Sequence, residues 1–294
     1  MIEARGAARA ESVHLAICWM LAAAWAIAFA VSAAGVAPNV AAALGLLQMV
    51  LLLLFVVAHG SLGYGWSGFA AYFAIAVLVS FGLEATSIAT GFPFGFYTHN
   101  VHVGFKPLGV PWPVPLDYAV AGWFGWIIAS LMARDDPSDG SGAARFTTPL
   151  IATFVLAGLD LPGDAIGATV LGQWTYRHPS GLFGVPLSNF LGWLFTGWVF
   201  YQLFALCQRR FPPHAATRRR GYWLAPCLIW LGFAGRYLLA YRAGASAVVT
   251  VGGRTFFAAD VYETSVILCL FTHVFVGLLG TVRALGAARL ETGR

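Results

Sequence analysis

Charged residues are scarce in this chain of 294 residues. Asp, Glu, Lys and Arg together make up 10% of the sequence, and 59% of the residues are hydrophobic. Soluble domains carry about 25% charged residues, because water must solvate their surface. The low charge therefore argues against a water-soluble domain and predicts an integral membrane protein.

Residue types that bind metals and cofactors are also few. The only Lys, Lys106, falls in an expected loop, which excludes a retinal protein because the Schiff base needs a Lys inside a helix. The seven His are scattered rather than clustered as in membrane di-iron enzymes, and the four Cys form no CxxC motif. The sequence also lacks a P-loop and a dinucleotide-binding fingerprint. We therefore expect no metal site and no cofactor.

The sequence contains several long apolar runs. A helix needs roughly 17 to 25 apolar residues to cross a bilayer. Eight runs reach that length, at about residues 14–34, 40–58, 67–89, 115–133, 147–171, 184–206, 221–240 and 261–282. A signal peptide is the alternative for the first run, but its length and the acidic Glu3 and Glu11 favour a retained helix. We predict an all-α, multi-pass bundle of about eight transmembrane helices that forms one integral domain, residues 1–294.

Basic residues predict which side each end of the bundle faces, because cytoplasmic segments are enriched in Lys and Arg. With the N-terminus inside, 12 of the 17 basic residues fall in inner segments. These are Arg5, Arg9, Arg134, Arg145, Arg209, Arg210, Arg218, Arg219, Arg220, Arg283, Arg289 and Arg294. We therefore predict cytoplasmic tails at residues 1–13 and 283–294. The net charge of +5 follows from this topology, so it does not indicate a nucleic-acid partner.

Half of the acidic residues gather in the predicted outer half of the bundle. They are Glu84, Asp117, Asp160, Asp164, Asp260 and Glu263. Asp260 and Glu263 form a D-x-x-E pattern, for which we expect a helix-capping role. Asp117 follows "PWPVPL" in an expected first helical turn, where the helix dipole favours a negative charge, so it has a structural and a functional interpretation.

The stretch "LAGLDLPGDAIGATVLGQW" (156–174) places two more acids at membrane depth. A helix that began at Thr147 and stopped before Asp160 would be only about 20 Å long, too short to cross. The helix is therefore expected to continue past Pro162, which puts Asp160 and Asp164 four residues apart on one face. A loop is the alternative. Glu84 lies at a similar depth, and ionisable groups at such depth indicate function.

Aromatic residues lie close to these acids in two outer segments, "GFPFGFYTHN" (91–100) and "GQWTYRHPSGLFGVPLSNFLGW" (172–193). Single rings there are typical interface anchors. Together with the acids they predict an apolar pocket. We expect its substrate-binding residues to be Phe94, Tyr97, His99, Trp174, Tyr176, Asn189 and Trp193. A weak echo between "LGVPWPVPLDYAVAGWFGW" (108–126) and "FGVPLSNFLGW" (183–193) also suggests a parallel internal repeat.

The motifs "GFPFGFYTH", "GVPWPVPLDY" and "DAIGATVLGQWTY" leading into "LFGVPLSNFLGW" resemble the carotenoid biosynthesis membrane proteins that include the carotenoid 1,2-hydratases. The likeness covers roughly residues 60–280. Family members carry Asp-Pro where this chain has Asp164-Ala165, so Asp160 and Asp164 both stay candidates. The resemblance implies addition of water to an acyclic end of a carotenoid such as gamma-carotene or lycopene. It also implies a location in a prokaryotic cytoplasmic membrane, with other carotenoid biosynthetic enzymes as partners.

The acids suit such a reaction, because an isolated alkene needs a strong proton donor and a water molecule to capture the cation. Burial disfavours a charged carboxyl, so one acid can stay protonated and another can orient the water. We predict Asp164 or Glu84 as donor and Asp160 as its partner, with Asp117 as a further candidate. Two alternatives remain open. One is a carotenoid cyclase, and the other is a proton-coupled lipophile transporter with Arg236 as counter-ion.

Overall fold

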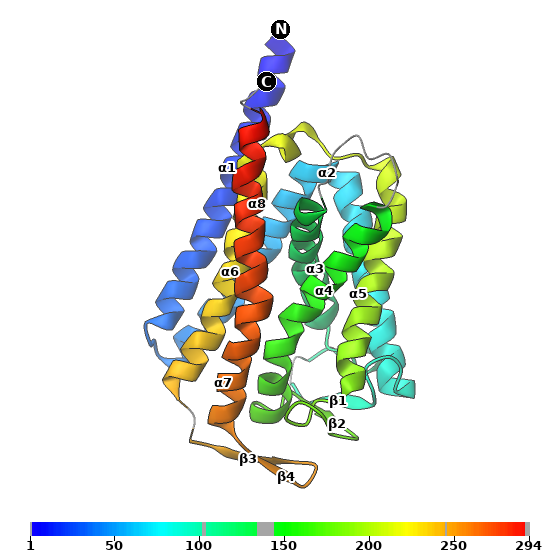
Figure 1. The fold of residues 1–294 in the computed structure, drawn as a ribbon, viewed down its shortest axis with the longest axis vertical. Helices are drawn as coiled ribbons and strands as arrows, with labels where there is room; N and C mark the ends of the chain where they lie inside the picture. Colours follow the sequence, from blue (N-terminus) through cyan, green and yellow to red (C-terminus); the bar gives the residue numbers. More distant parts are fainter. Residues whose placement is uncertain (1, 102–103, 134–143, 245, 292–294) are drawn as a thin grey trace.

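The computed structural model describes residues 2–101, 104–133, 144–244 and 246–291. The predicted inner loop at 134–143, with Arg134, lies outside them, and so does Arg294. Within these ranges seven helices are long and apolar enough to cross a membrane. They are α1 Ile2–Ala33, α2 Pro38–Thr90, α3 Pro113–Met132, α4 Ala144–Ala165, α5 Leu187–Cys207, α6 Arg220–Ala243, and α7 Ala258–Cys269 with its continuation α8 Phe275–Glu291. The all-α prediction is confirmed (Figure 1).

The long helix α2 accounts for the difference between eight predicted spans and seven helices. It has 53 residues and a non-helical residue, Gly65, with φ 69° and ψ 169°. The two arms on either side of Gly65 contain the predicted spans 40–58 and 67–89. Figure 1 shows one arm running along α1 and the other returning on the side of α5. The backbone N–H of His214 donates to the carbonyl of Gly63 at 2.7 Å, which holds the segment between α5 and α6 against the bend.

Both ends of the described chain lie at the same end of the bundle (Figure 1). This arrangement agrees with an even number of crossings, whereas the cytoplasmic location of that end stays a prediction. The predicted tails are helical where they are described, because α1 begins at Ile2 and α8 ends at Glu291. The short helices η3 Gln208–Arg210 and η4 Ala215–Arg218 connect α5 to α6.

Helix α4 continues past "DLPGD", as predicted, and contains both Pro149 and Pro162. A Pro inside a helix frees the carbonyl four residues earlier, and neighbouring side chains can satisfy it. The side-chain amide of Gln202 donates to the carbonyl of Arg145 at 3.2 Å and so satisfies the group that Pro149 frees. The helix then widens into a π-helical turn, η2 Ile166–Val170. A second π-helical turn, η5 Leu270–Val274, joins α7 to α8.

The other end of the bundle carries two small antiparallel strand pairs, which the sequence analysis did not predict. Strand β1 (Tyr97–His99) pairs with β2 (Trp174–Tyr176), and β3 (Val248–Val251) pairs with β4 (Arg254–Phe257). A short helix, η1 Pro107–Gly109, leads from β1 toward α3. In the first pair Thr98 and Thr175 face each other on the exposed side. Since side chains alternate along a strand, the two residues flanking each Thr point to the opposite, bundle side.

Aromatic packing and buried hydrogen bonds hold the bundle together. Lipid tails are as apolar as Leu, so close packing and polar contacts stabilise membrane helices more than burial itself. His59 on α2 is fully buried and accepts a hydrogen bond from the Trp123 indole at 3.0 Å through Nδ1. Its Nε2 is therefore left to donate to the carbonyl of Tyr222 at 2.8 Å. These contacts join α2, α3 and α6 close to the bend of α2.

Candidate active site

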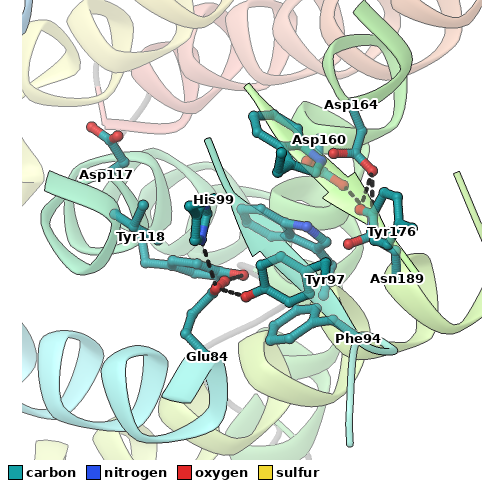
Figure 2. Close-up of a pocket in the computed structure, with 13 residues that line it drawn as sticks. Glu84, Phe94, Tyr97, His99, Asp117, Tyr118, Asp160, Asp164, Tyr176 and Asn189 are labelled. Atoms are coloured by element: carbon teal, nitrogen blue, oxygen red, sulfur yellow. Dashed lines mark hydrogen bonds and ion pairs between the residues drawn. The ribbon is translucent and has the colours of Figure 1, made fainter. Parts of the chain in front are cut away.

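A cavity of about 170 Å³ opens at the strand-bearing end of the bundle, among the ends of α2, α3, α4 and α5 (Figure 2). It is lined by Glu84, Phe94, Tyr97, His99, Val114, Asp117, Tyr118, Asp160, Asp164, Trp174, Tyr176, Asn189 and Trp193. All eleven residues that the sequence analysis proposed for the site therefore lie around one cavity. Their chemical roles stay predictions.

Glu84 lies near the end of α2 and is 5% exposed. The hydroxyl of Tyr97 donates to Oε2 of Glu84, and the hydroxyl of Tyr118 donates to Oε1 at 3.0 Å. The Nε2 atom of His99 lies 3.6 Å from the same Oε2. Glu84 thus accepts a hydrogen bond at each carboxylate oxygen and has an imidazole beside it.

Asp160 and Asp164 lie one turn apart on α4 and share a partner, which confirms that they are on one face. The side-chain nitrogen of Asn189 lies 2.5 Å from Oδ2 of Asp164 and 3.2 Å from Oδ2 of Asp160. The Tyr176 hydroxyl also donates to Asp164 at 3.1 Å. Burial and the nearby Asp164 charge raise the pKa of Tyr176 well above its ordinary value, so its hydroxyl keeps the proton that it donates.

Asp117 differs from the other three acids of the cavity. Helix α3 begins at Pro113, so Asp117 lies beyond the first turn and the helix dipole does not account for it, contrary to the prediction. Its side chain is exposed, and Figure 2 shows it directed away from the Glu84 and Asp164 carboxyls. Asp117 is therefore a residue of the cavity rim.

Asp260 and Glu263 do not line this cavity. The capping role predicted for them is wrong, because α7 begins at Ala258 after Phe257 and has no side-chain cap. Asp260 lies within the first turn instead, where its charge suits the helix dipole. Arg236, the counter-ion of the transporter alternative, is also absent from the cavity lining. It is exposed, and its guanidinium lies 5.4 Å from the ring centre of Phe233.

Aromatic rings form the apolar wall of the cavity. Tyr118 stacks on Trp193 with ring centres 4.2 Å apart. Phe94 is 1% exposed and passes over Gly192, where a Cβ atom would lie 2.3 Å from its ring. Trp174 passes over Gly167 in the π-helical turn, where a Cβ would lie 2.2 Å from its ring. These two glycines let the rings approach the helices closely.

Val114 and Tyr118 are the lining residues that the sequence analysis missed. The internal repeat already contained the signal for Tyr118. Aligning "VPLDY" (114–118) with "VPLSN" (185–189) puts Tyr118 at the position equivalent to Asn189, which was predicted. In the structure both side chains donate to an acid of the preceding helix, Tyr118 to Glu84 and Asn189 to Asp164.

The polar groups that line the cavity are carboxyl, phenol, amide, imidazole and indole groups. Among the described residues, no three His, Cys, Asp or Glu side chains are placed to hold one metal ion. Lys106 does not line the cavity. Its Nζ donates to the backbone carbonyl of His99 at 3.1 Å. The groups that face the cavity can donate, accept and relay protons.

Comparison with known proteins shows what this chain is similar to. A family model described as carotenoid biosynthesis protein matches residues 40–256. A bisanhydrobacterioruberin hydratase of Haloarcula japonica is 34% identical over 129 residues, which are 43% of this chain and 41% of that relative. The matched segment thus spans well under half of the relative. No solved structure matches the chain.

Proposed function

This chain belongs to the family of carotenoid biosynthesis proteins, and from that premise we propose that it is a carotenoid hydratase of the 1,2-hydratase type. It adds water across the terminal double bond of an acyclic carotenoid end and produces a tertiary alcohol. One observation supports the proposal above all: three acids, Glu84, Asp160 and Asp164, line the same small cavity as a set of aromatic rings.

The size of the cavity supports the proposal that only one end of the substrate molecule enters it. An apolar cavity of roughly 150 Å³ can bind benzene, a molecule of six carbons. A cavity of about 170 Å³ therefore has room for one isoprenoid end group, but not for a whole carotenoid. The rest of the polyene would extend into the surrounding lipid, against the apolar outer faces of the helices.

The residues around the cavity supply what hydration needs. A protonated carboxyl delivers a proton to the less substituted alkene carbon, and the positive charge develops on the tertiary carbon. Desolvated aromatic rings such as Trp193 and Phe94 stabilise a cation by roughly 2 kcal/mol. Water attacks the tertiary carbon and gives up a proton to a carboxylate. Every step is proton transfer or water addition, so the reaction requires no cofactor.

Cyclisation starts from the same protonation but needs the chain to fold back on itself beside the cation. The small cavity and its polar groups Asn189 and His99 favour an extended end with a water molecule beside it. The transporter alternative has less support, because Arg236 lies outside the cavity. We propose a location in the cytoplasmic membrane, where other enzymes of carotenoid biosynthesis would supply the substrate.

Oxygen-labelled water tests the proposal. The full-length protein is expressed in a lycopene-producing host in heavy-oxygen water, and the carotenoids are analysed by chromatography and mass spectrometry. The expected product carries one labelled hydroxyl per hydrated end. A product with a new ring and no oxygen would identify a cyclase, and label arriving only from molecular oxygen would exclude hydration.

A further inference from the structure

The cavity is built from two similar sets of residues. In each set, an acid near the end of one helix accepts hydrogen bonds from a Tyr in the next strand and from a polar side chain at the start of the next helix. The Glu84 half-site consists of Glu84, Tyr97 and Tyr118. The Asp164 half-site consists of Asp164, Tyr176 and Asn189, with Asp160 beside them.

The strand pair β1–β2 joins the two half-sites. Tyr97 and Tyr176 are cross-strand partners, and their ring centres are 5.9 Å apart. Each of these two Tyr donates to the acid of its own half-site. Since opposed residues of an antiparallel pair are related by a local twofold axis, the half-sites face each other across the cavity. Figure 2 shows Glu84 and the two aspartates on opposite sides of it.

The half-sites differ in how their acids are bonded. Glu84 accepts a hydroxyl hydrogen bond at each of its two oxygens. Tyr176 and Asn189 both donate to a single oxygen of their acid, Oδ2 of Asp164. The Asp164 half-site instead contains two carboxyl groups that approach one Asn189 nitrogen. Such a pair can hold one proton between its members. The chemistry of the two half-sites is therefore unequal although their geometry is similar.

We propose that the half-sites take opposite parts in the hydration: the Asp160–Asp164 pair donates the proton to the alkene, and Glu84, positioned by Tyr118, accepts the proton of the attacking water. This inference rests on the hydratase function proposed above. It says which residues act as the general acid and which as the general base of that reaction. It also gives a role to Tyr118, which holds Glu84 at 3.0 Å while its ring packs on Trp193.

The steps balance as follows. The aspartate pair loses a proton as a C–H bond forms at the less substituted alkene carbon, and the π electrons leave a tertiary cation. A water oxygen then forms the C–O bond, and the O–H bond of that water breaks toward Glu84. The product is a neutral tertiary alcohol. Water that enters the emptied cavity carries the proton from Glu84 back to the aspartate pair.

Deuterium exchange separates the two roles. The purified full chain is incubated with lycopene in D₂O, and both the alcohol and the deuterium in recovered lycopene are measured by mass spectrometry. In Glu84→Gln the cation still forms, and loss of a proton back to the aspartates returns it to a deuterated alkene. We expect hydration to fall roughly 100- to 10,000-fold, the usual contribution of a general base, while exchange persists.

Asp164→Asn should lose hydration and exchange together, because the amide cannot deliver the proton. Asp260→Asn provides the matched control, since Asp260 is an exposed acid that does not line the cavity. It should keep both activities. Thermal unfolding of each variant in detergent establishes that the chain is folded before the activities are compared.

Two hydroxyl hydrogen bonds, one in each half-site, provide a second and gentler test. Tyr118→Phe and Tyr176→Phe each remove one hydroxyl and keep the ring. Loss of a hydrogen bond to a charged group should lower hydration roughly 10- to 100-fold in both. Only Tyr176→Phe should lower deuterium exchange as well. A merely structural role of Tyr118 would reduce exchange and hydration by the same factor.

The outcomes separate this assignment from the proposed function. Exchange that survives in Asp164→Asn and disappears in Glu84→Gln would reverse the roles, and equal loss of both activities in the two folded variants would refute the division. A wild-type chain that neither hydrates nor deuterates lycopene would overturn the hydratase proposal together with this inference.

Discussion

At the scale of single residues, Gly192 decides how closely the Phe94 ring can approach α5. A Cβ atom there would lie 2.3 Å from the ring, so Gly192→Ala must displace Phe94 from the cavity wall. Overpacking of this kind costs about 1–3 kcal/mol. We expect a lower unfolding temperature in detergent and less hydration product.

Gly45→Ala is the control for this prediction, because a Cβ at Gly45 would meet nothing within 4 Å. It adds the same methyl group to an exposed helix position and should leave product formation unchanged. Equal stability and activity of Gly192→Ala and Gly45→Ala would show that the wall can shift without consequence.

At the scale of the elements, the bend of α2 depends on Gly65. Its φ of 69° lies in the left-handed region, which a Cβ disfavours, and the His214 ring lies 3.0 Å from the position of that Cβ. Gly65→Ala should therefore lower the free energy of unfolding by more than about 1 kcal/mol. Chemical unfolding in mixed micelles measures the difference.

Gly82→Ala tests whether the Gly65 effect comes from the bend or from the helix. Gly82 lies in the regular part of α2 with nothing within 4 Å of its Cβ position. Ala is a better helix former than Gly by up to about 1 kcal/mol, so this variant should be equally or more stable. A similar loss in both variants would mean that the bend is not the sensitive feature.

At the scale of the whole molecule, the sidedness of the bundle can be tested with its own cysteines. Cys207 at the end of α5 is exposed, whereas Cys18, Cys227 and Cys269 are buried. The excess of Arg in the adjoining segment predicts that Cys207 faces the cytoplasm. A membrane-impermeant maleimide should leave it unlabelled in intact cells and label it in inverted vesicles.

A second variant tests the opposite end. Cys207→Ser should abolish the labelling in inverted vesicles, and Thr98→Cys added to it should restore labelling in intact cells, because Thr98 is exposed on β1. The reverse pattern would place the cavity at the cytoplasmic end of the bundle.

The amino-acid sequence by itself determined that this protein is a membrane helix bundle, where its apolar spans lie and which acids are candidates for the site. These properties depend on local composition: a run of apolar residues crosses a bilayer wherever it occurs, and an acid at membrane depth is costly in any fold. The continuation of α4 past Pro162 was predictable for the same reason, because a shorter helix could not cross.

Only the tertiary structure decided which residues face each other. The pairing of Tyr97 with Tyr176, the contact of Tyr118 with Glu84 and the sharing of Asn189 by two aspartates join segments that are 79, 34 and up to 29 residues apart. No local pattern encodes such contacts, because they depend on how the helices pack and on the register of two short strands. Helix packing also joined two predicted spans into one bent helix. It placed acids that are far apart in the sequence in two half-sites that face each other.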